Sequence, residues 1–300
     1  MKPKKTLFIV NPISGTKDKA KVVDQIKAEV SPSHFDYHIE FTKGPSHATD
    51  MAVEAAENKL DLVVAVGGDG TVNETACGLI HTNTSLGIIP IGSGNGLGRH
   101  LQIPTNPIKA IRSLHESEVK KVDVCTANDI PFFNVAGVGY DARVAHDFAR
   151  KKSRGFITYV QSVLGQWNGY KPKKYKLTTP SGSFKKRALL ISFANGSQFG
   201  NNAFIAPNAS ISDGLMDVSI LEKFPGFAVP VVAMQLFNKT IEESRYSDIF
   251  KTNEVTVKQK SKKVHLDGEP FKLGKKICFK VMPGALNILA PKVFEDGFHT

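Results

Sequence analysis

The spacing of hydrophobic residues along the chain changes near residue 125. Before this point, runs of apolar and β-branched residues alternate with stretches of helical spacing, which is typical of a parallel sheet covered by helices on both faces. We therefore predict an N-terminal doubly wound α/β domain over residues 1–125. Its predicted strands are 6–10, 36–42, 61–66 and 86–90, and its predicted helices are a stretch ending at Val30 and the ranges 46–60, 71–80 and 106–117.

After residue 125 the apolar segments become shorter, more strictly alternating and separated by turn residues. This pattern is typical of an antiparallel β-sandwich. We therefore predict a C-terminal antiparallel β-sandwich domain over residues 126–285. Its predicted strands are 132–139, 175–184, 187–194, 214–221, 253–259, 263–271 and 275–282, and its two predicted helices are 142–148 and 156–167.

Composition is compatible with a two-domain protein that does not cross a membrane. The 300 residues are 41% hydrophobic, enough for two ordinary cores. The longest apolar stretch, residues 224–237, contains two prolines and is shorter than the ~20 residues of a bilayer span. Cys77, Cys125 and Cys278 lie far apart without CxxC spacing, which fits a reducing cytoplasm and predicts no zinc site.

The net charge of +11 is confined to the second part of the chain. Residues 1–125 hold 14 Lys and Arg against 14 Asp and Glu, whereas residues 126–300 hold 25 against 14. Basic clusters at 150–154, 171–176, 185–187 and 258–263 are either solvated turns or a surface for anionic lipid headgroups. Because no helix-turn-helix, RNP or zinc-finger pattern accompanies them, we expect no nucleic-acid partner.

Two glycine-rich turns follow the third and fourth predicted strands, with the sequences GGDGT at 67–71 and GSGNG at 92–96. Ligands of open parallel sheets bind beyond the carboxyl ends of the strands, where glycines and a helix N-terminus can receive phosphate. Asp69 would repel phosphate unless a cation such as Mg²⁺ lay between them. The alternative is a structural glycine turn capped by Asp69. Neither a P-loop nor a dinucleotide fingerprint is present at the first strand.

Five motifs occur in a fixed order: NPISG at 11–15, GGDGTVNE at 67–74, PIGSGNGLGRHL at 90–101, SDGLMDV at 212–218 and LDGEP at 266–270. In this combination the sequence resembles the diacylglycerol kinase catalytic-domain family of lipid kinases, which includes the sphingosine and ceramide kinases. The resemblance implies that residues 286–300 return to the first domain. It also implies ATP- and Mg²⁺-dependent phosphorylation of the hydroxyl of a membrane lipid, diacylglycerol in the first place.

The resemblance also implies roles for individual residues. Glu269 matches the proposed proton acceptor, with Asp267 in the same acidic cluster and Asp69 beside the phosphates; Asp141 matches an acid near the lipid head. A structural Mg²⁺ would be bound by Asp213 and the carbonyl groups of Ser210 and Leu215. The implied nucleotide contacts are Asn11, Thr42, Gly67, Gly68, Asp69, Gly70, Thr71, Val72, Asn73, Glu74, Ser93, Gly94 and Asn95.

The residues by themselves support this chemistry less specifically. A lipid hydroxyl that attacks a γ-phosphate needs a carboxylate to accept its proton, and Asp267 and Glu269 lie close together in the sequence. Asp-Gly is, however, also the usual sequence of a hairpin turn. Asp141 is equally well explained as the N-cap of a helix.

One departure from the family pattern leaves the substrate open. Bacterial diacylglycerol kinases usually have GTxND where this chain has GSGNG, with Ser93 and Gly96 as the differences. That version resembles the sphingosine and ceramide kinases, so a long-chain base is an alternative substrate. A soluble substrate, as in NAD kinases, is a second alternative, and a non-catalytic nucleotide- or nucleic-acid-binding protein is a third. We expect a cytoplasmic enzyme, peripheral at the inner membrane face, with a homodimer left open.

Overall fold

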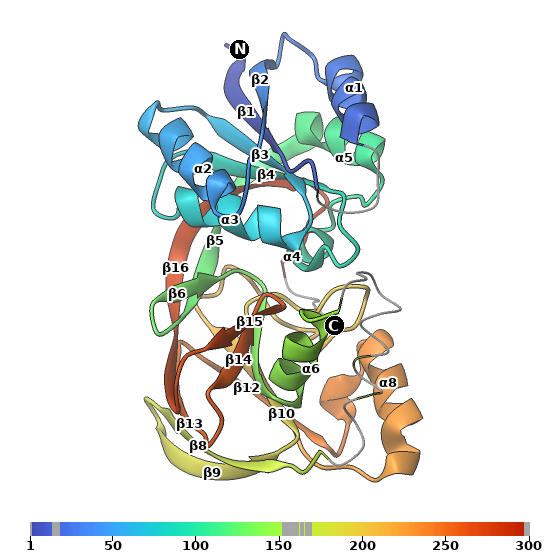
Figure 1. Ribbon diagram of the computed structural model, residues 1–300, viewed down its shortest axis with the longest axis vertical. Helices are drawn as coiled ribbons and strands as arrows, with labels where there is room; N and C mark the ends of the chain where they lie inside the picture. The colour runs from blue at the N-terminus through green and yellow to red at the C-terminus, as the bar shows by residue number, and fades with distance from the viewer. Residues whose placement is uncertain (1, 14–18, 152–161, 163–164, 166–169, 297–300) are drawn as a thin grey trace. The chain divides into compact units, whose positions relative to one another are not determined.

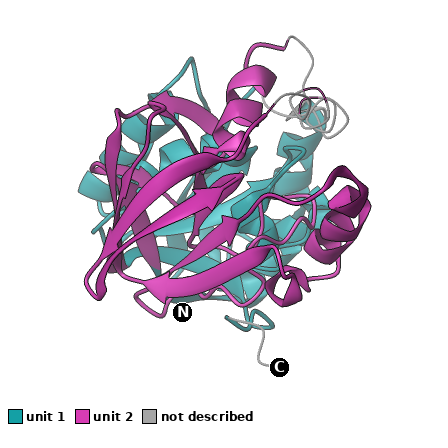
Figure 2. Ribbon diagram, turned by 90° about the horizontal axis from the view of Figure 1, so that it is seen from below, with its two compact units in different colours: residues 1–122, 284–296 teal, residues 123–283, 297–300 magenta. Residues whose placement is uncertain are grey.

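The structure, a computed structural model, describes all residues except 1, 14–18, 152–161, 163–164, 166–169 and 297–300. Backbone contacts divide the chain into two units (Figure 2). The first consists of residues 1–122 and 284–296, and the second of residues 123–283. The two units are described in turn.

The first unit is built on a parallel sheet with the strand order β2-β1-β3-β4-β16. Strands β3 and β4 are buried along their whole length, because helices cover both faces of the sheet. Helices α2 and α3 pack against each other, and α1 packs against α5 (Figure 1). The elements are β1 (Lys4–Val10), α1 (Lys19–Glu29), β2 (Phe35–Phe41), α2 (His47–Glu57), β3 (Leu62–Gly67), α3 (Asp69–Leu79), β4 (Ser85–Pro90), α4 (Gly96–His100), α5 (Pro107–Ser113) and η1 (Leu114–Glu116).

The second unit is an antiparallel sandwich. One sheet has the order β12-β11-β10-β7-β14-β15, and the other contains β16-β13-β8-β9. The elements are β6 (Ile130–Phe132), β7 (Val135–Gly139), α6 (Tyr140–Phe148), β8 (Lys173–Thr179), β9 (Gly182–Ala188), β10 (Leu190–Ala194), β11 (Met216–Leu221), η2 (Gly226–Ala228), α8 (Val229–Phe237), η3 (Ile241–Glu243), β12 (Ser247–Thr252), β13 (Glu254–Lys258), β14 (Lys263–Leu266) and β15 (Glu269–Lys272).

Two long strands contain the boundaries between the units. Strand β5 (Ser117–Ala127) leads from the first unit into the second, and β16 (Lys276–Pro291) leads back. The first residues of β16 pair with β13 in the sandwich, and Ile288, near the end of β16, pairs in parallel with Leu86 of β4. The last strand of the first unit is therefore supplied by the C-terminal part of the chain.

The predicted fold class, an α/β domain followed by an antiparallel sandwich, is confirmed. Two predicted strands, 175–184 and 263–271, are in fact hairpins, β8–β9 and β14–β15. Strands β5 and β12 were not predicted, because their alternation is interrupted by charged residues. Helix α6 begins two residues before the predicted one, and the predicted helix at 156–167 lies almost wholly outside the described residues.

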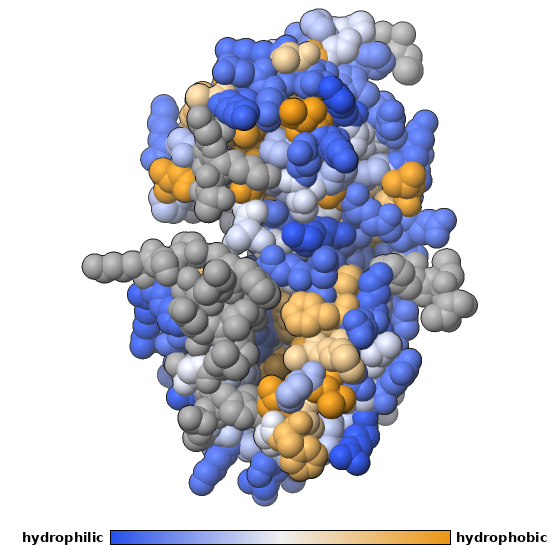
Figure 3. Space-filling view, turned by 90° about the vertical axis from the view of Figure 1, so that its right-hand side faces the viewer, coloured by the Kyte–Doolittle hydropathy of each residue, from blue (hydrophilic) through white to orange (hydrophobic). Residues whose placement is uncertain are grey.

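Helices η2 and α8 form part of the long apolar stretch and present several large apolar side chains to solvent. Phe227, Val231, Met234 and Phe237 are all strongly exposed, and Figure 3 shows an apolar patch on the face that carries α8. In the part of the chain that the structure describes, no helix is long and apolar enough to span a bilayer.

The sandwich core depends on aromatic packing between its two sheets. The rings of Phe193 and Phe279, from opposite sheets, stack with centroids 3.7 Å apart and an interplanar angle of 13°. Phe132 meets Phe279 edge to face. All three side chains are fully buried.

We expect Phe279→Ala to lower the free energy of unfolding by about 3–5 kcal/mol, because a buried aromatic side chain is lost and a cavity is left between the sheets. Guanidinium denaturation followed by circular dichroism measures this. The control is Phe227→Ala, whose side chain is 81% exposed and should change stability by no more than about 0.5 kcal/mol. Equal effects of the two substitutions would contradict the assigned core.

Candidate active site

Two glycine loops meet at the carboxyl ends of β3 and β4. Gly68 and Gly92 face each other so closely that a Cβ on Gly92 would come within 2.6 Å of the Gly68 Cα. A Cβ on Gly67 would come within 2.4 Å of the Thr71 side chain. Two physical reasons account for the glycines in these loops. The packing of the loops against each other leaves no room for side chains, and a backbone without side chains can be approached by phosphate.

The Asp69 carboxylate joins the two loops. Its Oδ2 accepts a hydrogen bond from the Asn95 N–H at 2.8 Å, and its Oδ1 accepts one from the Gly96 N–H at 2.7 Å. Burial raises the pKa of Asp69, although these backbone donors act in the opposite direction. A Cβ on Gly94 would come within 2.8 Å of the same carboxylate. Asp69 thus holds the second loop against the first.

The other predicted nucleotide contacts surround this junction. The Asn11 side chain donates to the Thr71 hydroxyl at 2.9 Å, and Thr42 is buried at the end of β2 with its N–H donating to Val10. The Asn95 backbone is left-handed, with φ 53°, and its amide group donates to the Gly92 carbonyl at 2.8 Å. Ser93 is exposed. The remaining residues, Gly70, Val72, Asn73 and Glu74, lie in the first turns of α3.

In the second unit, the sequence Asp267-Gly268 is the two-residue turn between β14 and β15. Both residues have positive φ, 49° and 86°, which is the turn that Asp-Gly favours in hairpins. The Asp267 carboxylate accepts three backbone hydrogen bonds, from Phe133 at 2.8 Å, Asn134 at 2.9 Å and Val135 at 3.0 Å. The Asp267 N–H donates to the Val135 carbonyl in return. Asp267 therefore fixes the hairpin to the segment between β6 and β7.

Glu269 follows this turn and differs from Asp267 in its surroundings. It is the first residue of β15, pairs with Leu266 across the hairpin and has an exposed side chain. Among the residues that the structure describes, none forms a hydrogen bond or ion pair with its carboxylate. Of the two predicted acids, Asp267 is thus held by backbone hydrogen bonds, and Glu269 is exposed to solvent.

Asp141 lies beneath the same hairpin. It is buried in the first turn of α6, and its Oδ2 lies 2.5 Å from Nε2 of the equally buried His265 in β14. The His265 Nδ1 accepts a hydrogen bond from the Gly268 N–H at 3.3 Å. Gly137 leaves the space for this pair, because a Cβ there would come within 2.6 Å of both side chains. Asp141 is not the N-cap of α6, a position that Gly139 occupies.

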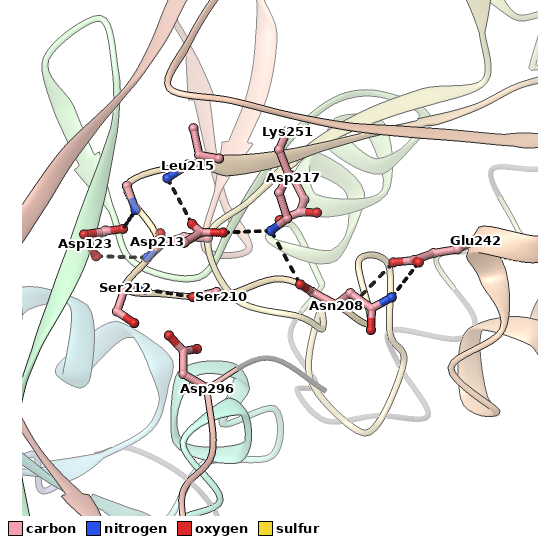
Figure 4. A network of polar contacts seen from close by, with 12 residues as sticks. Asp123, Asn208, Ser210, Ser212, Asp213, Leu215, Asp217, Glu242, Lys251 and Asp296 are labelled. Carbon is pink, nitrogen blue, oxygen red and sulfur yellow. Dashed lines mark hydrogen bonds and ion pairs between the residues drawn. The ribbon is translucent and has the colours of Figure 1, made fainter. Parts of the chain in front are cut away.

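The predicted metal loop, with Ser210, Asp213 and Leu215, forms a polar network (Figure 4). The Asp213 Oδ2 accepts from Lys251 Nζ at 2.9 Å, and its Oδ1 accepts from the Leu215 N–H at 3.0 Å. Lys251 also pairs with Asp217 at 2.9 Å. Mg²⁺ is bound by oxygen ligands, usually including one or two carboxylates. In the structure, the ammonium group of Lys251 is the cation that pairs with the Asp213 carboxylate. The contacts therefore do not support the predicted Mg²⁺ ligands, which stay a prediction.

The sequence did not identify four residues that build these sites: Gly92, Arg99, Gly137 and His265. Arg99 donates to the Gly94 carbonyl at 3.0 Å and so holds the second loop. The glycine pattern at 92–96 contained the evidence for Gly92. The other three act through contacts that spacing does not reveal. His265 and Asp141, for example, are 124 positions apart.

Comparison with known proteins matches two family models to this chain. Residues 5–127 match the family model of the diacylglycerol kinase catalytic domain, and residues 134–290 match that of the YegS C-terminal, NAD kinase β-sandwich-like domain. A protein of Chromohalobacter salexigens named "Probable lipid kinase YegS-like" is 31% identical over 81% of this chain and 80% of its own length. The protein named "Diacylglycerol kinase" in Bacillus subtilis is 28% identical over 89% of this chain and 90% of its own.

Solved structures show the same fold. A Bacillus anthracis protein described as a candidate diacylglycerol kinase superimposes with a TM-score of 0.81 at 27% identity, covering 97% of this chain and 99% of its own. The glycine loops lie in the part that matches the catalytic-domain model, and the hairpin of Glu269 lies in the part that matches the YegS sandwich model. This chain belongs to the diacylglycerol kinase catalytic-domain family of lipid kinases.

Proposed function

We propose that the protein transfers the γ-phosphoryl group of ATP, with Mg²⁺, to the hydroxyl of a membrane lipid alcohol, diacylglycerol in the first place. The observation that carries the proposal is the difference between the two acids of the hairpin. Three backbone donors hold Asp267, whereas Glu269 is exposed and unbonded within the described chain. A positioned free carboxylate is what the acceptor hydroxyl requires.

In this proposal the glycine loops bind the nucleotide phosphates. The N-terminus of α3 offers N–H groups and the positive end of the helix dipole to them. Mg²⁺ would arrive with ATP and offset the phosphate charge. Asp69 keeps the loops together through Asn95 and Gly96, and Glu269 accepts the proton of the lipid hydroxyl as the phosphoryl group is transferred.

The surroundings of Asp141 favour a neutral lipid alcohol over a long-chain base. The amine of a long-chain base would need an accessible carboxylate, and Asp141 was the candidate. Its side chain is buried and already bonded to His265. A diacylglycerol has no charged group to pair, so it makes no such demand.

Labelled ATP, Mg²⁺ and a set of acceptors in mixed micelles test the proposal. The set contains diacylglycerol, sphingosine, ceramide and, as a soluble acceptor, NAD. We expect transfer to diacylglycerol. Transfer to NAD alone, or to none of the acceptors with an intact fold, would overturn the proposal.

Glu269→Gln should reduce turnover by about 10²-fold or more, because the base that accepts the hydroxyl proton is lost. ATP affinity, measured by titration calorimetry, should stay unchanged. The matched control is Glu243→Gln, which makes the same change at another exposed glutamate of the second unit. Unchanged turnover in the Glu269 variant would remove this residue from the mechanism.

Asp267→Asn should reduce both turnover and stability. The amide group can replace only part of the acceptor capacity for three backbone N–H groups, and an unsatisfied buried group costs about 1–3 kcal/mol. Thermal melting and turnover should therefore fall together in this variant, whereas only turnover falls in Glu269→Gln. If Asp267→Asn melted with the parent and lost all activity, Asp267 itself would be the better candidate for the base.

Gly92→Ala should weaken ATP binding and lower the melting temperature. Its Cβ would meet the Gly68 Cα and force the two loops apart, an overpacking that costs about 1–3 kcal/mol. Gly44→Ala is the control, because a Cβ there has no neighbour within 4 Å. Parental ATP affinity in Gly92→Ala would show that the loop contact does not shape the nucleotide site.

A further inference from the structure

Three of the basic clusters in the sequence come together on one sheet face of the second unit. Strand pairing sets Lys276 of β16 opposite Lys258 of β13, Lys258 opposite Lys176 of β8, and Lys176 opposite Lys185 of β9. These four residues, the lysine row, cross four adjacent strands in register, and all four side chains are exposed. With neighbouring strands about 4.8 Å apart, the row is about 14 Å long.

A second cationic pair extends the row. Lys174 and Arg187 are also opposite each other, two residues away on β8 and β9, and both are exposed. The next positions on the other side are small and polar: Cys278, Thr256, Thr178 and Ser183. Within the bounds of these four strands the one acidic residue is Glu254, which lies opposite Lys280, four residues from Lys258 on β13.

The fold does not neutralise the lysine row. Within the described part of the chain, no acidic side chain forms an ion pair with Lys276, Lys258, Lys176 or Lys185. Lys186, which points to the other face of β9, is by contrast paired with both Glu222 and Asp248. Like charges directly opposite each other in a sheet are destabilising. The repulsion between the lysines of the row therefore lowers the stability of the fold, and an anionic partner would offset this repulsion.

We propose that the lysine row is a docking surface for the anionic headgroups of a lipid bilayer. The net charge of +11 lies in the unit that contains the row, which supports an anionic partner. Residues 123–283 contain 24 Lys and Arg against 13 Asp and Glu. The choice of a bilayer rests on the proposed function, since a lipid alcohol is presented in a membrane.

Nucleic acid fits this face less well. Single strands are bound through aromatic side chains on which bases stack, and the outward positions beside the row contain no aromatic residue. A broad four-stranded face also does not enter a duplex groove, which admits a helix or a two-stranded ribbon. A flat array of headgroups matches an extended row of lysines.

The structure also shows which lysines of the basic clusters can belong to the proposed docking surface. Lys173 lies on the inner face of β8, half-buried, with its ammonium group 5.4 Å from the ring centre of Tyr170. The cluster at 150–154 lies mostly outside the described residues, and Lys151 pairs with Asp147. The surface is thus formed by the alternate residues Lys174 and Lys176 with their partners on neighbouring strands.

Binding to vesicles without ATP tests the inference separately from catalysis. The probes are phosphatidylglycerol–phosphatidylcholine vesicles and pure phosphatidylcholine vesicles, in a sedimentation assay. The test variant replaces all four lysines of the row by glutamine. Because each lysine near an anionic surface contributes about a factor of five, we expect binding to the anionic vesicles to fall about 100-fold or more. Binding by the parent should weaken steeply between about 0.05 and 0.5 M salt.

A matched control removes the same charge elsewhere. Lys21, Lys27, Lys109 and Lys121 are exposed residues of the first unit, and their replacement by glutamine should leave most of the binding intact. The row variant should melt at the parental temperature or above, because opposed like charges are removed. The double variant Lys176→Gln/Lys258→Gln makes the same comparison with fewer changes if the quadruple variant folds poorly.

Three results would overturn the inference. The first is equal loss of vesicle binding in the row variant and the control, which would indicate only net charge. The second is binding that survives in the row variant but is lost in Phe227→Ser/Met234→Gln, which would assign docking to the exposed apolar side chains of η2 and α8. The third is loss of duplex DNA binding in the row variant with vesicle binding unchanged. A lack of kinase activity in the parent would contradict the proposed function and leave the vesicle result standing.

Discussion

The hydrogen bonds to Asp267 are the constraint on which the position of Glu269 depends. Three backbone N–H groups of residues 133–135 point at one carboxylate, and the carboxylate lies in the turn of a two-residue hairpin. Left-handed backbone at both turn residues makes this hairpin tight and its register definite. The consequence is that Glu269, two residues later, extends from a fixed point, and within the described residues no hydrogen bond or ion pair engages its carboxylate.

The same arrangement occurs at the glycine loops of the first unit, with Asp69 in the place of Asp267. A carboxylate from one loop accepts the backbone N–H groups of Asn95 and Gly96 in the other, and the glycines Gly68 and Gly92 allow the two backbones to touch. An acid beside a phosphate site suggests a metal ligand when only the sequence is considered. The structure shows that it also has a mechanical role, because its two oxygens accept backbone N–H groups of the second loop, which Arg99 supports as well through the Gly94 carbonyl.

Strands β1, β3 and β4 of the first unit could be predicted from the sequence, because short apolar and β-branched runs between stretches of helical spacing are typical of buried parallel strands. The short helix α4 was not predicted. The glycine loops could be predicted from their place after β3 and β4. The pairing of Asp141 with His265 could not, since the two residues are 124 positions apart and each has an ordinary local explanation. Lys251 beside Asp213 is a similar case: the family resemblance implied a cation at this loop, and the cation in contact with Asp213 is a lysine from a strand 38 positions later.

The lysine row shows why charge clusters in a sequence do not define a surface. Lys173 and Lys174 are neighbours in the chain yet lie on opposite faces of β8, because successive side chains of a strand alternate. Lys176 and Lys276 are 100 positions apart yet lie on the same face, because two strand registers align them through Lys258. A shift of either register by one residue would turn one lysine inward and bring a core residue such as Val257 to the surface. The hydrophobic core that fixes the registers therefore also fixes the charge pattern, so the row is as well defined as the core beneath it.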